Sequence, residues 1–286
     1  MVTYRKSTMT ILRHPVVSRG FTACLAVLLG AFAVACGGGS SSSATPPAAE
    51  GDSAASRGAR IVDEFLKRDA SPFRKERVRF TVTEPDVAAK VYEIETWRKQ
   101  SGGDTTTLTQ IVTPAEDSGL ASLTLESKDK KTVVVTYVAS RGDFRETDTG
   151  KMFFGGLTAG ELLGEWYKFD YRFLSEKDSG GAKVFEVEGK LKPGTDSVVS
   201  RLTAAFRADD YVLTEMHLFG SDGKENRTYK FSDLKTVDGH SYPARAEVDN
   251  AVYRSHIVIE VLKLEYPAAI DDSMFDRERL KQGSKK

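Results

Sequence analysis

Histidines and paired carboxylates are the side chains of this chain that could carry out acid–base or metal chemistry. The four histidines, His14, His217, His240 and His256, are widely spaced, without the close His or Cys pairs typical of structural zinc sites. We expect His240, in an Asp-Gly turn, to be solvated, and His217 and His256 to be ordinary strand residues. No Gly-x-Ser-x-Gly elbow, phosphate-binding loop or HExxH sequence occurs. The histidines therefore give no support to an enzyme.

The adjacent carboxylates Asp209-Asp210 and Asp271-Asp272 are poor candidates for a catalytic pair. Neighbouring side chains of an extended segment point to opposite faces. Asp209-Asp210 precedes Tyr211 and fits a turn between two strands better. We predict from these patterns a protein that is not an enzyme and that uses no cofactor or metal ion.

Cys36 is the strongest candidate for a modified residue. Upstream of it lie basic residues between Arg5 and Arg19, then an uncharged apolar run from Phe21 to Val34, which is the composition of a secretion signal. The run is shorter than the roughly 20 residues that a membrane-spanning helix needs. With small residues directly before Cys36, the segment resembles a bacterial lipoprotein signal, in which that cysteine becomes the acylated, palmitate-bearing first residue of the mature chain.

Two alternatives stay open for this signal. Cys24 is a rival acylation site, although it would leave too short an apolar stretch, and an ordinary cleaved signal with an incidental cysteine is the other. Gly37, rather than Asp, follows the cysteine, which in the lipoprotein pattern of enteric bacteria implies export to the outer membrane. We therefore predict a lipid-anchored protein on the periplasmic face of the outer membrane, with residues 1–35 as its signal peptide.

The mature chain divides into a tether and one folded domain. Residues 36–56 are rich in Gly, Ser, Ala and Pro, a composition that cannot offset the entropy of ordering, so a flexible tether is expected. Residues 57–286 form the predicted domain. Cys24 lies in the signal and Cys36 directly after it, so the domain has no disulfide. The whole chain's net charge of +0 gives no support to nucleic-acid binding.

Hydrophobic periodicity predicts a mainly β domain after one N-terminal helix. Ile61, Val62, Phe65 and Leu66 have helical spacing and predict a helix from Arg60 to Asp69, which Pro72 ends. Apolar and polar residues then alternate, with turn signals at short intervals, which indicates a sandwich or barrel. The expected strands include Val78–Val82, Val91–Trp97, Thr105–Val112, Ala121–Glu126, Thr132–Val138, Phe144–Thr147, Tyr167–Leu174, Lys183–Lys190, Leu202–Ala208, Val212–Phe219, Thr228–Leu234, Tyr242–Val248 and His256–Leu264.

An apolar, glycine-rich insert from Met152 to Trp166 interrupts the strands. Thr158 and Glu161 have the spacing of a capping box and predict a short helix from Thr158 to Leu163. The insert can cover the open end of a curved sheet, either as a core plug or as a movable lid. Asp222-Gly223 and Asp238-Gly239 predict tight hairpins, so the sheet is expected to be antiparallel and locally connected.

An ordered set of short segments resembles the outer-membrane lipoprotein-sorting protein family, the relatives of the LolA and LolB carriers. The resemblance covers most of residues 75 to 280. It is carried by Gln110–Glu116, Ser118–Ala121, the insert, Phe206–Met216, Phe219–Lys224, Phe231–Leu234, Asp238-Gly239, Tyr242–Arg245 and Phe275. It implies a strongly curved, half-open antiparallel β-barrel whose concave apolar face is covered by helices and loops and accommodates acyl chains.

The large apolar residues on the strands and the insert are the candidates for a lipid-binding cavity or its lid. Burying an acyl chain is favourable by about 0.8 kcal/mol per methylene. The candidate set is Trp97, Val135, Tyr137, Phe153, Phe154, Leu157, Leu162, Leu163, Trp166, Met216 and Leu218.

We expect the protein to bind acyl chains of lipids or lipoproteins in a hydrophobic cavity and to act in sorting or transfer to the outer membrane. Its expected partners are acylated lipoproteins or lipids, the membrane that holds its own anchor, and an inner-membrane transporter. The alternative is a non-catalytic envelope scaffold or sensor that uses the same fold, with a filled core, to bind a protein.

Overall fold

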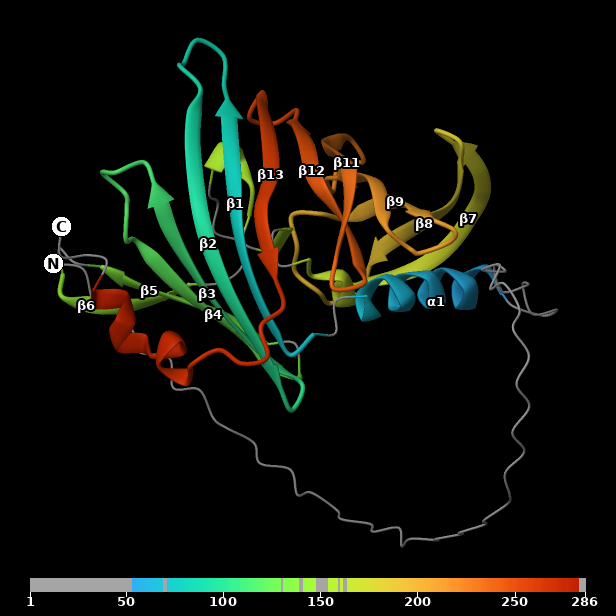
Figure 1. Ribbon diagram of the computed structural model, residues 1–286. Coiled ribbons are helices and arrows are strands. Elements are labelled where there is room, and N and C mark those ends of the chain that lie inside the picture. The colour runs from blue at the N-terminus through green and yellow to red at the C-terminus, as the bar shows by residue number, and fades with distance from the viewer. Residues whose placement is uncertain are drawn as a thin grey trace, which may run out of the picture. The chain divides into compact units, whose positions relative to one another are not determined.

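One antiparallel sheet of 13 strands forms most of the structure (Figure 1). The computed structural model describes residues 53–68, 71–129, 131–138, 141–147, 154–158, 160–161 and 164–282. The strands are β1 (Phe73–Thr83), β2 (Lys90–Ser101), β3 (Asp104–Thr113), β4 (Ala121–Glu126), β5 (Thr132–Val138), β6 (Asp143–Thr147), β7 (Phe169–Ser179), β8 (Ala182–Leu191), β9 (Arg201–Arg207), β10 (Leu213–Phe219), β11 (Glu225–Val237), β12 (His240–Asn250) and β13 (Ser255–Glu265).

The sheet order is β6-β5-β4-β3-β2-β1-β13-β12-β11-β10-β9-β8-β7. Sequential strands are therefore neighbours, except β6 and β7, and β1 pairs with the last strand, β13, in the register Phe80↔Ile259. The two strands at the ends of this order, β6 and β7, are consecutive in the chain, and the insert connects them. The predicted mainly β, antiparallel and open curved sheet is confirmed, and each expected strand is present.

Helix α1 (Ala54–Lys67) begins several residues before the expected start. The Ser53 hydroxyl accepts a hydrogen bond from the Ser56 backbone N–H at 3.1 Å, and this cap satisfies a backbone group that would otherwise lack a partner. Ile61 and Val62 are buried against the sheet. Within the described part of the chain, no helix is both long enough and apolar enough to cross a membrane.

Gly58 lets α1 pack closely against β7. A Cβ added to Gly58 would lie 2.6 Å from the backbone nitrogen of Phe173. Beside it, the Arg57 guanidinium lies 3.6 Å from the centre of the Phe173 ring and 3.3 Å from the Glu176 carboxylate. The helix is thus fixed to the edge strand by apolar, cation–π and ionic contacts together.

The apolar residues form two clusters on opposite faces of the sheet. On β2, Ile94 belongs to the larger cluster and Trp97 to the smaller one, and side chains three residues apart on a strand point to opposite faces. We call the face of Ile94, which also packs against α1, the inner face, and the face of Trp97 the outer face. The large apolar residues of the strands therefore do not all lie on one face, although the expected apolar concave face would require it.

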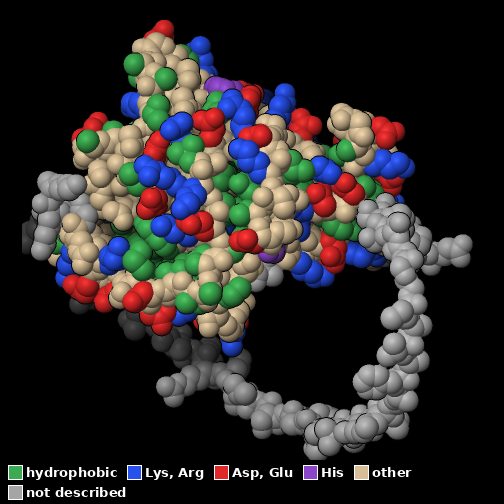
Figure 2. All heavy atoms as spheres, viewed as in Figure 1, with side chains coloured by type: hydrophobic (Ala, Val, Ile, Leu, Met, Phe, Trp, Pro, Cys, Tyr) green, Lys and Arg blue, Asp and Glu red, His purple; other side chains and the backbone are tan. Residues whose placement is uncertain are grey.

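The outer cluster is covered by two short 3-10 helices near the C-terminus. These are η3 (Asp272–Phe275) and η4 (Arg277–Lys281). Leu280 of η4 is 2% exposed and packs with Leu108, Leu123 and Val135. Figure 2 shows hydrophobic side chains gathered beside this C-terminal segment.

Ion pairs cross the outer face of β1, β2, β12 and β13. Arg79 and Arg77 lie 2.8 Å and 2.7 Å from the two oxygens of Glu93, and Arg245 lies 3.3 Å from Glu260. Figure 2 shows basic and acidic side chains interspersed over these strands. The hydrogen bonds from Arg79 and Arg77 hold the pKa of the Glu93 carboxyl below its ordinary value.

Candidate functional site

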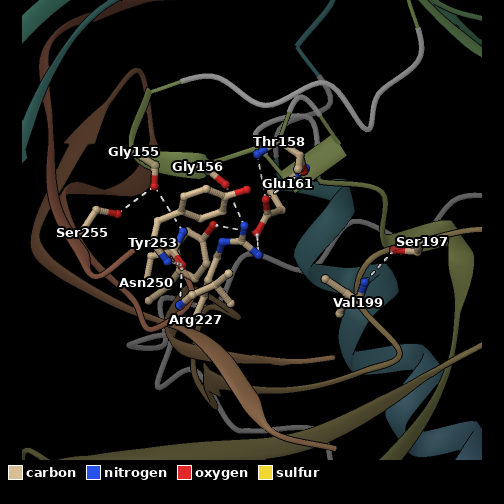
Figure 3. Close-up of polar contacts among 12 residues, drawn as sticks. Gly155, Gly156, Thr158, Glu161, Ser197, Val199, Arg227, Asn250, Tyr253 and Ser255 are labelled. Carbon is tan, nitrogen blue, oxygen red and sulfur yellow. Dashed lines mark hydrogen bonds and ion pairs between the residues drawn. The ribbon is translucent and has the colours of Figure 1, made fainter. Parts of the chain in front are cut away.

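The backbone of the insert is bound to the inner face by three buried polar side chains (Figure 3). Asn250 and Ser255 donate hydrogen bonds to the Gly155 carbonyl, at 3.2 Å and 2.7 Å. Arg227 donates to the Gly156 carbonyl at 2.7 Å. A buried carbonyl without a partner is costly, so these side chains from β11, β12 and β13 determine where the insert crosses the sheet.

A buried ion pair connects the insert to β11. The Arg227 guanidinium lies 3.1 Å from Glu161, and each side chain is 6% exposed. Glu161 also accepts a hydrogen bond from the Thr158 N–H at 2.8 Å, while its own N–H donates to the Thr158 hydroxyl at 3.2 Å. The predicted capping box is thereby confirmed. The Nε of Arg227 finds no hydrogen-bond partner in the described part of the chain.

Tyr229 lies close to the same carboxylate. Its hydroxyl donates to Glu161 at 3.5 Å, and burial together with the charge of Glu161 raises the pKa of Tyr229 above its ordinary value. Arg227, Tyr229 and Phe231 alternate on the inner face of β11, so one strand supplies both the polar and the apolar contacts of the insert.

Gly156 permits the closest contact between the insert and the turn after β12. Its φ is +81°, and a Cβ there would lie 2.3 Å from the Tyr253 ring. The Asn250 side chain positions this turn by accepting from the Val252 and Tyr253 backbone N–H groups at 3.1 Å each. Sequence reasoning identified the glycines of the insert but not the reason for them.

A pocket of about 340 Å³ lies beside the insert. Its walls come from the insert and the start of β7, from the loop before β9, and from the inner face of β9 and β10. They consist of Thr158, Gly160, Glu161, Gly164, Glu165, Trp166, Lys168, Phe169, Asp196, Ser197, Val198, Val199, Leu202, Met216 and Leu218. This volume falls within the range of small-molecule pockets, about 300–1,000 Å³.

Much of the pocket wall is apolar. Trp166 is 9% exposed, and its ring lies 5.1 Å from that of Phe65 on α1 and 6.0 Å from that of Phe206 on β9, centre to centre. Tyr171 fixes the backbone at this point by donating to the Trp166 carbonyl at 2.5 Å, and burial raises the pKa of its hydroxyl. Trp166 is therefore held in place by Phe65 of α1, by Phe206 of β9 and by the hydrogen bond from Tyr171.

The predicted lipid-contacting residues do not form one set. Trp166, Met216 and Leu218 line the pocket, and Leu157 lies in the same inner core with 0% of its surface exposed. Trp97, Val135 and Tyr137 lie in the outer cluster. Cys36, Phe153, Leu162 and Leu163 are outside the described residues, and only the backbone of Phe154, at the start of η1 (Phe154–Gly156), is described.

The inner face of β2 to β5 carries hydroxyl groups where an apolar lining was expected. Thr96, Thr109, Ser122 and Thr136 lie opposite one another on four consecutive strands. They share the face of Ile94, because Thr96 follows it by two residues. This row of the inner face is therefore polar, whereas much of the wall of the pocket beside the insert is apolar.

A second pocket, of about 460 Å³ and lined mainly by residues of polar type, lies at the ends of β11, β12 and β13. It includes Arg227, Asn250 and Ser255, together with the exposed pair His256 and Asp249, whose side chains are 2.8 Å apart. Arg227, Asn250 and Ser255 hold the backbone of the insert, and the His256–Asp249 pair connects the ends of β13 and β12.

His240 was expected to be solvated, and this was wrong. It is half-buried, its Nδ1–H donates to the Arg68 carbonyl at 3.1 Å, and its ring lies 4.8 Å from that of Tyr266. The end of α1, which approaches this turn only in the folded chain, supplies its partner. Within the described ranges, no group of three or more His, Cys, Asp or Glu side chains is arranged to hold a metal ion.

The open curved antiparallel sheet with its covering helix and insert is a fold that this chain shares with a LolA superfamily protein. A family model described as uncharacterized protein, of the DUF1329-like kind, matches residues 103–282. This is more than half of the chain, so the chain belongs to that family. No curated protein matches the chain.

Three solved structures share the fold. A DUF1329 family protein from Desulfovibrio piger has 17% identity and a TM-score of 0.74, over 80% of this chain and 100% of that one. A domain described as an outer-membrane lipoprotein-sorting protein domain, from Vibrio parahaemolyticus, has 15% identity and a TM-score of 0.72, over 79% and 99%. A LolA superfamily protein from Nitrosomonas europaea has 14% identity and a TM-score of 0.64, over 77% and 98%.

Proposed function

We propose that this protein is a lipid-anchored, non-catalytic protein of the bacterial envelope that binds an acyl chain in the pocket beside the insert. The apolar wall of that pocket, formed by Trp166, Phe169, Leu202, Met216 and Leu218, is the observation that carries the proposal. Hydrocarbon buried there gains about 25 cal/mol per Å² of apolar surface removed from water. The cargo is an acylated lipoprotein or lipid on its way to the outer membrane, received from an inner-membrane transporter.

The shared fold supports this function as an analogy. The Vibrio parahaemolyticus domain with this fold carries a lipoprotein-sorting description, but a fold by itself does not establish function. What this chain adds is a pocket at the same end of the sheet as an insert joining the edge strands.

Trp166 provides a direct reporter of ligand entry. The chain has two tryptophans, so Trp97→Phe in the outer cluster leaves Trp166 alone in the pocket wall. With the mature protein purified from the envelope, we expect a short-chain, monomeric phospholipid to shift the Trp166 emission in a saturable manner. No saturable shift at any concentration below micelle formation would contradict acyl binding here.

A matched pair of variants locates the binding site. Met216→Glu places a charge on the half-buried pocket wall, and Met274→Glu places the same charge in the outer cluster. We expect the first to abolish the shift and the second to retain it, with circular dichroism confirming that both remain folded. Loss in Met274→Glu alone would assign the ligand to the outer cluster.

The membrane anchor needs a separate test. Metabolic labelling with an alkyne-bearing palmitate analogue should mark the protein and place it in the outer-membrane fraction. Cys36→Ser should remove the label, while Cys24→Ser should retain it. The reverse result would move the acylation site to Cys24.

The alternative, a protein-binding scaffold with a filled core, is favoured by one observation. Leu157 has 0% of its surface exposed, and the adjacent Gly155 and Gly156 are fixed by buried hydrogen bonds. A permanently bound insert would make the inner core a plug. Failure of the Trp166 experiment, together with a protein captured by cross-linking in cells, would support this function.

A further inference from the structure

The pocket contains an ion pair that the acyl-binding proposal does not use. The Lys168 ammonium lies 2.7 Å from the Glu165 carboxylate, and the two side chains are 15% and 14% exposed. Both line the pocket. Lys168 also donates to the Asp196 carbonyl at 3.2 Å, which places the pair next to the loop that contributes the exposed Val198.

Two of the three carboxylates that line the pocket are paired with a cation. Glu161 is compensated by Arg227 within the core, at 3.1 Å, and Glu165 is compensated by Lys168. Asp196 adds one carboxylate on the exposed side. A ligand head that enters beside Val198 therefore meets the mostly buried Lys168–Glu165 pair and the exposed Asp196.

A partly buried ion pair discriminates between heads by their charge. A head with a net negative charge meets Lys168 but is repelled by Glu165, and a head with a net positive charge has the opposite difficulty. A head with one anionic and one cationic group gives each wall charge an additional opposite partner. Interactions among poorly solvated charges are weakly screened, so the unmatched charge penalises the other heads.

We propose that the pocket selects zwitterionic amphiphiles, whose phosphate lies at Lys168 and whose ammonium lies at Glu165, with the acyl chain against Trp166 and Met216. This inference rests on the proposed acyl-binding function and names its ligand class. The ligand chemistry is an ammonium and a phosphate on one acylated head, as in an ethanolamine phospholipid.

The test uses the Trp166 emission in Trp97→Phe and two soluble probes with identical chains, dihexanoyl phosphatidylethanolamine and dihexanoyl phosphatidylglycerol. We expect the zwitterionic probe to bind about tenfold more tightly than the anionic one, a factor that each 1.4 kcal/mol of binding free energy gives. Equal affinities would overturn the inference and leave acyl binding intact. Absence of binding by both would overturn the proposed function itself.

Variants of the pair assign the selectivity to it. Glu165→Gln should weaken the zwitterionic probe and remove most of the preference, because both probes carry the phosphate and only one carries the ammonium. Glu116→Gln, in an exposed loop outside the pocket lining, should retain the preference. The double exchange Glu165→Lys with Lys168→Glu keeps one charge of each sign and should restore selectivity. Unchanged selectivity in Glu165→Gln would overturn the inference, whether or not the double exchange folds.

Discussion

Arg227 is the residue on which the attachment of the insert depends most. Its partner Glu161 is as deeply buried as Arg227 itself, with 6% of each side chain exposed. Removing one member of a buried pair leaves an uncompensated charge, which costs about 3–5 kcal/mol. We expect Arg227→Met to lower the free energy of unfolding by that amount in urea denaturation.

The double variant Arg227→Met with Glu161→Leu is the control for this prediction. Because it removes both charges and leaves apolar groups, it should recover most of the lost stability. If the free energy of unfolding of Arg227→Met lies within about 0.5 kcal/mol of the wild-type value, the usual range for surface substitutions, a buried role for the pair is contradicted.

Gly156 should tolerate no side chain. A Cβ at this position would meet the Tyr253 ring at 2.3 Å, whereas Gly223, with φ +77°, has no atom within 4 Å of an added Cβ. Both positions have left-handed backbone, which costs a non-glycine residue about 1–2 kcal/mol. Gly156→Ala should therefore destabilise more than Gly223→Ala in thermal unfolding, by about 1–3 kcal/mol for the overpacking. Equal losses would show that Tyr253 moves aside.

At the scale of single residues, local spacing predicted what local contacts determine. Thr158 and Glu161 are three residues apart, and their reciprocal hydrogen bonds are the predicted capping box. Arg227 was missed because its partners are at Gly156 and Glu161, distant in sequence. The available signal was its position on the inner face of β11, in alternation with Tyr229 and Phe231.

At the scale of elements, the packing of α1 gives a prediction that reverses helix propensity. Alanine is favoured over glycine within a helix by about 1 kcal/mol, yet a Cβ at Gly58 would lie 2.6 Å from the Phe173 backbone. We expect Gly58→Ala to lower the melting temperature because β7 cannot move away. Ala59→Gly, at an exposed position of the same helix, should be destabilising for the ordinary reason. An increased melting temperature for Gly58→Ala would show that α1 is loosely packed.

The ion pairs of the outer face predict that the stability of the protein depends on pH. Arg79 and Arg77 hold the pKa of Glu93 below its ordinary value, about 4.3 in an unfolded chain. The contribution of these ion pairs to the free energy of unfolding is complete above that pH and is lost as the pH falls through the lower pKa of the folded state. The difference in unfolding free energy between wild type and Glu93→Gln should thus shrink below about pH 4. Glu116→Gln, in an exposed loop, controls for loss of one carboxylate, and a constant difference would contradict the pairing.

Strand periodicity identified the elements but not which face each would bury. Alternation around Trp97 and Val135 correctly predicts β2 and β5. The same alternation assigns these residues to a face without saying which covering segment meets it. The C-terminal segment packs on the outer face through Leu280. Because this contact is distant in sequence, local alternation could not show that Trp97 and Val135 lie on the face opposite to the pocket.

At the scale of the whole molecule, one sheet has a hydrophobic core on each of its two faces. The inner core connects β7 to β13, β1 and β2 with α1 and the insert, while the buried residues of the outer core connect β3 to β5 with η4. Stability within a protein is often divided into cooperative units of this kind. The pocket belongs to the inner unit, so the outer unit should be able to loosen without affecting ligand binding.

Leu280→Ala tests this division. Leu280 is 2% exposed, and truncation of a buried leucine costs about 2–5 kcal/mol. If the units are separate, hydrogen exchange should accelerate in β3 to β5 and remain slow in β8 to β10, and the Trp166 response to lipid should be unchanged. Leu157→Ala, with the same truncation in the inner core, should accelerate exchange around the pocket instead. Uniform acceleration over the whole sheet in both variants would mean that the two cores unfold as one unit, and that the outer cluster supports the pocket through the strands they share.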